Sequence, residues 1–211
     1  MNKNALFEQL HITEKHTGKM SGMLSLSSCC LCNKHCQEYS KNKQTICAHC
    51  YASAQLKRYK NTVATFTKNG ELLSGGILNS QQLPTINARF FRFEAFGDLL
   101  NATHCINFFN IAKKNKYTQF ALFTKNIQYV AQAIAAGHKK PDNLQIIYSS
   151  LLLNTASDKM LTKYPFIDKI FTVYDKQHAD AVAINCGAKR CIDCLLCYTK
   201  NDVQRINERL K

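Results

Sequence analysis

Ten of the eleven cysteines lie in two short stretches near opposite ends of the 211-residue chain. The first stretch, CCLCNKHCQEYSKNKQTICAHC, holds a C-x3-C pair and a C-x2-C pair, preceded by Cys29 and Cys30. The second, CGAKRCIDCLLC, has the spacing C-x4-C-x2-C-x2-C. Two intervening residues let both thiolates of a pair face one metal centre, and zinc and iron–sulfur sites both use that spacing. The spacing therefore predicts metal ligands, which are Cys32, Cys36, Cys47, Cys50, Cys186, Cys191, Cys194 and Cys197.

The spacing of the second stretch favours an iron–sulfur cluster over zinc. Zinc ribbons usually pair two C-x2-C knuckles across a longer loop, which this stretch lacks. Successive short spacings are typical of ferredoxin-type loops, which wrap a [4Fe–4S] cluster. Zinc as the bound metal, and one site shared by pairs from both stretches, are also compatible with the sequence.

The composition limits the class of protein. Hydrophobic residues make up 45% of the chain, which is typical of a globular protein of one domain. No apolar run is long enough for a signal peptide or a membrane helix. We therefore expect a cytoplasmic protein, in which thiols stay reduced and clustered cysteines bind metal. The net charge of +14 favours anionic partners such as nucleic acid or nucleotides, although a solvated basic surface explains it equally well.

Strand and helix patterns alternate along the middle of the chain. Strands are predicted over 22–28, 90–96, 117–126, 144–150 and 167–175. Helices are predicted over 50–59, 101–115, 127–138, 157–164 and 176–184. This order predicts a parallel sheet with covering helices, which curls into a partial (β/α) barrel of about five strands.

We predict a single domain over residues 1–211. It consists of an N-terminal extension (1–19), a barrel-like core (20–185) that includes the first cysteine stretch, and a C-terminal segment (186–211). In the last segment, Thr199 and Asp202 have capping-box spacing ahead of an apolar stripe, which predicts a terminal helix after the second cysteine stretch.

Polar residues gather where the predicted strands end. Ligands of parallel α/β folds bind at the carboxyl ends of the strands, where the first cysteine stretch also begins. Strand alternation places Arg92 and Glu94 on one face, where buried charges are costly unless they pair or bind a ligand. The residues that end the other predicted strands are each typical of a cap or turn, but together they predict a polar pocket. They are Asp98, Thr124, Lys125, Ser149, Ser150 and Asp175. The candidate catalytic residues are Arg92, Glu94, Asp98 and Lys125, and the candidate cofactor-binding residues are Gly97, Thr124, Ser149, Ser150 and Asp175.

Taken in order, these motifs resemble the phage gene-product-eighty-eight family. The matching motifs are C-x3-C, TICAHCYA over 45–52, RF followed by GD over 92–98, F followed by TK over 120–125, and the terminal cysteines. Members of that family look like compact relatives of radical S-adenosylmethionine (SAM) enzymes, which carry a cysteine loop after the first strand of a partial barrel. The resemblance implies that Cys47 and Cys50 bind a first cluster together with Cys32 or Cys36. It also implies that the four C-terminal cysteines bind an auxiliary cluster.

The resemblance further implies SAM as a cofactor and an electron donor for the cluster. SAM cleavage needs one iron without a cysteine ligand, whereas a cluster with four cysteines suits electron transfer or a structural role. Ten residues separate the C-x3-C from the C-x2-C, whereas radical SAM enzymes typically have one C-x3-C-x2-C run. Three functions follow. The first is a radical SAM-like redox enzyme that acts on a nucleotide, nucleic acid or other anionic substrate. The second is a nucleic-acid-binding protein that is stabilised by zinc or iron–sulfur clusters. The third is an electron carrier.

Overall fold

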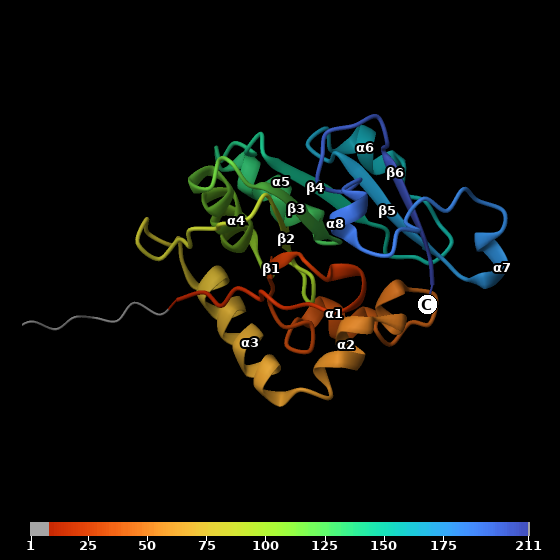
Figure 1. Ribbon diagram of the computed structural model, residues 1–211, viewed down its shortest axis with the longest axis horizontal. Helices are drawn as coiled ribbons and strands as arrows, with labels where there is room; N and C mark the ends of the chain where they lie inside the picture. Colours follow the sequence, from red (N-terminus) through yellow and green to blue (C-terminus); the bar gives the residue numbers. More distant parts are fainter. Residues whose placement is uncertain (1–8, 211) are drawn as a thin grey trace, which may run out of the picture.

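The computed structural model describes residues 9–210, and a sheet of parallel strands forms the centre of this part of the chain. The strands are β1 (Leu24–Leu26), β2 (Phe90–Phe93), β3 (Gln119–Thr124), β4 (Leu144–Ser149), β5 (Lys169–Tyr174) and β6 (Arg205–Arg209). They pair in sequence order, with β1 and β6 at the two edges (Figure 1). Because right-handed crossovers place all connecting helices on one side, the sheet curves into a partial barrel that is not closed. The predicted fold class is confirmed, with six strands instead of about five.

Helices cover the convex face of the sheet and form the main core with it. The long helices are α3 (Lys60–Gly75), α4 (Ala102–Lys114) and α5 (Ile127–Ala135). The aromatic rings of Phe93 and Phe108 stack with centroids 4.1 Å apart, which joins β2 to α4. The short helices are α1 (Lys34–Tyr39), α2 (Tyr51–Leu56), α6 (Lys159–Lys163), α7 (Lys176–Ala179) and α8 (Cys191–Cys194), with 3-10 turns η1 (Gly18–Met20) and η2 (Ile46–His49).

The C-terminal segment covers the concave face of the sheet. Phe90, Phe123 and Ile147 point to this side and pack against residues around α8. Tyr198 is fully buried there, with its ring edge-on to Phe90 at 6.2 Å between centroids. Figure 1 shows α8 in front of the sheet. The second cysteine stretch thus lies inside the curve of the partial barrel.

The predicted terminal helix over 199–211 is wrong over its described residues. This part of the chain contains β6, which pairs in parallel with β5 from Ile170 opposite Arg205 to Tyr174 opposite Arg209. Ile206 is 1% exposed on this strand. The Thr199 hydroxyl donates to the carbonyl of Leu195 and caps no helix. Ladder hydrogen bonds and burial of one apolar side chain therefore outweigh the local helical pattern.

The sequence prediction also missed α3 and overextended the helix over 176–184. The α3 sequence is mostly polar, and its buried side is built from few residues, including Phe66, Asn69 and Leu73. Asn69 accepts a hydrogen bond from the backbone of His11 and donates to the carbonyl of Ser27. The helix thereby ties the described part of the N-terminal extension to the end of β1. The predicted helix over 176–184 is reduced to α7.

Candidate functional site

The first cysteine stretch forms a loop beyond the carboxyl ends of the first strands. Asn33 caps α1 by accepting hydrogen bonds from the backbone of His35 and Cys36. Its amide also donates to the carbonyl of Asp98 over 3.0 Å. Further along, the backbone of Ile46 donates to a carbonyl in the loop after β4 over 2.9 Å. These contacts fix the loop at the edge of the sheet where parallel α/β proteins bind ligands.

Three cysteines of this loop, Cys36, Cys47 and Cys50, lie near Lys125, the residue that follows β3, and Cys30 contacts Cys50. A hydrogen bond from Cys30 lowers the pKa of Cys50 to about 6. Burial raises the pKa of Cys36, and the nearby charge of Asp98 raises it further. We call these residues the first cysteine group, which consists of Cys30, Cys36, Cys47 and Cys50.

Lys125 supplies a positive charge to the first cysteine group. Burial alone would lower the pKa of its ammonium, but Asp98 and the thiolates of Cys47, Cys36 and Cys50 together raise it. Within the described chain, its ammonium has no carboxylate within ion-pair distance. The Lys125 ammonium lies near the Asp98 carboxylate and the sulfur atoms of Cys36, Cys47 and Cys50.

Cys32 and Cys29 lie outside the first cysteine group. Cys32 is exposed, and its sulfur lies 3.1 Å from the Thr67 hydroxyl of α3. Cys29 is buried, and this burial raises its pKa. A smaller contribution in the same direction comes from the hydrogen bond with Cys32. Of the two cysteines that the resemblance offered as partners of Cys47 and Cys50, the structure thus brings Cys36 to them and leaves Cys32 apart.

The second cysteine group surrounds a small pocket of about 30 Å³ beside α8. Lys19 approaches it from η1, with its ammonium 3.3 Å from the sulfur of Cys186 and 2.6 Å from a carboxylate oxygen of Glu208. Burial raises the pKa of Cys197 to about 12. All four predicted ligands of this stretch line the pocket, namely Cys186, Cys191, Cys194 and Cys197.

Arg92 lies on the concave face, close to the second cysteine group. Its guanidinium carbon is 3.8 Å from the centre of the Phe123 ring, and its Nε is buried without a hydrogen-bond partner. Burial would lower its pKa, but Tyr51, Tyr198 and two thiols of the second group raise it. No carboxylate of residues 9–210 lies within ion-pair distance. A partly buried cation without a carboxylate partner is costly alone and is suited to an anionic neighbour.

Glu94 does not share the concave face with Arg92, so that prediction is wrong. Its backbone φ is 56°, a left-handed conformation that breaks the strand alternation. One carboxylate oxygen accepts hydrogen bonds from the backbone and hydroxyl of Ser28, each over 3.1 Å. The other lies 3.2 Å from Nε2 of His104 in α4, and both side chains are fully buried. Glu94 therefore links the start of the cysteine loop to the helix layer.

Asp98 fixes the turn that carries Lys125. One carboxylate oxygen accepts hydrogen bonds from the Thr124 hydroxyl at 2.5 Å and the Leu99 backbone at 2.8 Å. The other accepts from the Lys125 backbone at 3.0 Å. The residue is 1% exposed. These contacts give Asp98 a positioning role beside the first cysteine group.

We expect Asp98→Asn to lower the free energy of unfolding by about 2 to 3 kcal/mol, because its new amide would face the Lys125 N–H donor in a buried site. Urea denaturation would measure the loss. Asp202→Asn is the matched control, since Asp202 is exposed and takes no part in the contacts that hold this turn. Equal losses for both variants would contradict the positioning role.

The remaining predicted pocket residues lie along the same edge of the sheet, and the side chains of Thr124, Ser150 and Asp175 already contact other residues of the protein. Gly97 and Thr124 belong to the turns around Asp98. The Ser150 hydroxyl lies 3.2 Å from that of Thr172, and Asp175 bonds to His178 at the start of α7. Ser149, the last residue of β4, is buried.

Several residues near the cysteine groups were not singled out from the sequence. Tyr51 belongs to the TICAHCYA motif, and its hydroxyl donates to the carbonyl of Ala95 over 2.5 Å. His104 and Lys19 reach their sites only through tertiary packing. A tyrosine inside a cysteine motif was a usable signal, whereas the histidine and the lysine gave none.

The two groups supply the kind and number of donors that a cysteine-ligated cluster takes. All eleven cysteines are free thiols. Among residues 9–210, however, no set of three or more His, Cys, Asp or Glu side chains is close enough together to hold a metal ion. Binding at either group would therefore involve rotation of cysteine side chains toward the metal.

Fold and site together define a cysteine-rich α/β protein built on an open, parallel partial barrel. The family model described as "Gene product 88" matches residues 2–208, and the chain belongs to this family. No curated protein and no solved structure matches the chain. None of the helices in the described residues combines the length and apolar character that a membrane span requires.

Proposed function

We propose that this protein is an iron–sulfur protein with a [4Fe–4S] cluster in each cysteine group. The proposal is supported by the neighbours of the cysteines: Cys36 lies near Cys47 and Cys50, Cys30 contacts Cys50, and the four C-terminal cysteines line one small pocket. Four cysteines are the ligand set of such a cluster. A lysine accompanies each set, Lys125 in the first and Lys19 in the second, and its charge would balance the negative charge of thiolate ligands.

One-electron transfer is the activity that these ligand sets support best. If all four cysteines of the first group bind iron, no iron is left open for SAM. The second cysteine group lies inside the curve of the sheet, beside Arg92, whose charge favours an anionic cluster there. The chain's own contribution would be to hold both clusters and to set their charge environment.

A radical SAM-like enzyme with an anionic substrate is the second candidate. It is favoured by the position of the first cysteine group at the carboxyl ends of the strands, where parallel α/β enzymes bind substrates. This candidate requires that only three cysteines of the first group bind iron. SAM would then be the cofactor, and an external electron donor would be needed.

We expect protein purified without oxygen to contain about eight iron atoms per chain, four for each cluster. The reduced protein should give an EPR signal that does not change when SAM is added. A signal shifted by SAM would instead support the radical SAM-like enzyme. Zinc in place of iron at both groups would overturn the iron–sulfur proposal.

A further inference from the structure

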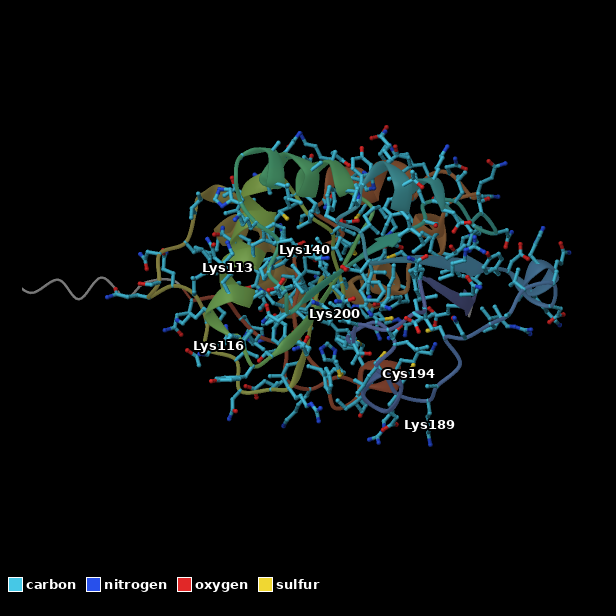
Figure 2. All side chains as sticks on the ribbon, turned by 90° about the horizontal axis from the view of Figure 1, so that it is seen from above. Lys113, Lys116, Lys140, Lys189, Cys194 and Lys200 are labelled. Carbon is cyan, nitrogen blue, oxygen red and sulfur yellow. The ribbon has the colours of Figure 1, made fainter. Side chains whose placement is uncertain are left out.

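Exposed lysines from separate segments gather at the edge of the sheet formed by the amino ends of the strands. Because all strands are parallel, the segments that lead into β2 to β6 meet at this one edge, about 4.8 Å apart from strand to strand. Figure 2 looks down on the molecule from above and labels Lys113, Lys116, Lys140 and Lys200 on that side. Lys189, from the second cysteine stretch, is labelled in the same view.

We call these segments the basic edge, defined as 84–89, 113–118, 137–143, 163–168 and 199–204. They contain eight cations against three carboxylates, a net charge of +5. The cations are Arg89, Lys113, Lys114, Lys116, Lys139, Lys140, Lys163 and Lys200, and the carboxylates are Asp142, Asp168 and Asp202.

Little of this charge is neutralised by the protein itself. Asp168 pairs with Lys140 at 2.5 Å, and it is the one ion pair within the basic edge among the described residues. Lys113, Lys116 and Lys200 are exposed. Like charges held close together at a surface repel one another. An extended anion bound along the basic edge would therefore reduce this repulsion.

An exposed aromatic ring identifies the class of anion. Tyr117 is 85% exposed, and the Lys116 ammonium lies 5.1 Å from the centre of its ring. An aromatic ring beside lysines is the combination that binds single-stranded nucleic acid, since lysines contact phosphates and the ring stacks on an unpaired base. A duplex offers the ring no free base, because its bases are already stacked on one another, and a lipid surface contains no bases.

We propose that the basic edge binds single-stranded nucleic acid, with its lysines on the phosphates and Tyr117 stacked on one base. The surface lies at the opposite ends of the strands from the first cysteine group. Nucleic acid bound there is therefore a docked partner and not a substrate of that group. The proposal does not depend on which metal the cysteines bind, so it and the iron–sulfur proposal can fail separately.

The test measures fluorescence anisotropy of a labelled, mixed-sequence DNA strand of about 20 nucleotides. The variant combines Lys113→Glu, Lys116→Glu and Lys200→Glu. A matched control combines Lys41→Glu, Lys43→Glu and Lys57→Glu, which makes the same charge change on exposed lysines beside α1 and α2. We expect the basic-edge variant to bind at least about tenfold more weakly near 100 mM salt, with a flatter salt dependence, because about three phosphate contacts are lost. The control should change affinity only about threefold or less.

A second set of variants keeps the test valid if charge reversal impairs folding. The corresponding Lys→Gln triple variant should show the same loss of affinity, and Tyr117→Ala should weaken binding by roughly tenfold. Metal content should stay at the unmodified protein's level in both. The proposal is overturned if the unmodified protein does not bind the strand at about 50 mM salt, or if the control triple variant loses as much affinity. Equal binding of a duplex or of phosphatidylserine vesicles, unaffected by Tyr117→Ala, also overturns it.

Discussion

Cys30→Ser is expected to halve the iron content of protein purified without oxygen, from about eight to about four atoms per chain, whereas Cys32→Ser should leave it unchanged. The structure places Cys30 against Cys50 in the first cysteine group. Cys32 is exposed and contacts Thr67. Elemental analysis of iron, together with acid-labile sulfide, measures the difference.

The second cysteine group supplies the matched controls for this experiment. Cys197→Ser should remove the other half of the iron, and the Cys30→Ser, Cys197→Ser double variant should contain almost none. Cys105→Ser tests the loss of a thiol alone, since Cys105 is a fully buried residue of α4 in the main core and belongs to neither cysteine group. Iron lost with Cys32→Ser and retained with Cys30→Ser would contradict the structural ligand set and favour Cys32, one of the two partners that the family resemblance offers for Cys47 and Cys50.

The strands could be predicted from the sequence because most of them are buried on both faces. Such strands appear as continuous apolar runs, as in β3 and β4. Alternation also correctly predicted that Phe90 faces one side of β2, whereas Phe91 and Phe93 both face the other. The edge strand β6 is different, because its residues are mostly polar and only Ile206 is deeply buried. Its strand conformation depends on pairing with β5, which no local pattern reports.

The candidate site could be predicted only in part, because cysteine spacing identifies ligands without saying how the chain turns between them. Asn33 begins α1 and thereby directs Cys36 toward Lys125, while Cys32 stays outside. The left-handed conformation of Glu94 was equally unpredictable, since residues other than glycine rarely adopt a positive φ. The surrounding hydrogen bonds from Ser28 impose it, and those contacts come from tertiary structure.

Gly97→Ala is expected to lower the free energy of unfolding by about 3 kcal/mol, at the upper end of the cost of overpacking a buried site. A Cβ at this position would overlap the Ser28 hydroxyl oxygen and a Glu94 carboxylate oxygen, and it would lie 2.5 Å from the Ser28 carbonyl oxygen. Neither neighbour can move easily, because the carbonyl belongs to the backbone and Glu94 is fully buried against His104. Urea or thermal denaturation would measure the loss.

Gly75→Ala is the matched control, because a Cβ at Gly75 meets no atom within 4 Å. It should leave stability unchanged or raise it by up to about 1 kcal/mol, since alanine favours the helix. Ser28 and Glu94 follow β1 and β2, so displacing them also shifts the start of the first cysteine loop. Gly97→Ala should therefore reduce the iron bound by the first cysteine group and spare that of the second. A destabilised variant that retains all its iron would show that the loop holds its metal without the Ser28–Glu94 contact, and an unchanged stability would contradict the close packing itself.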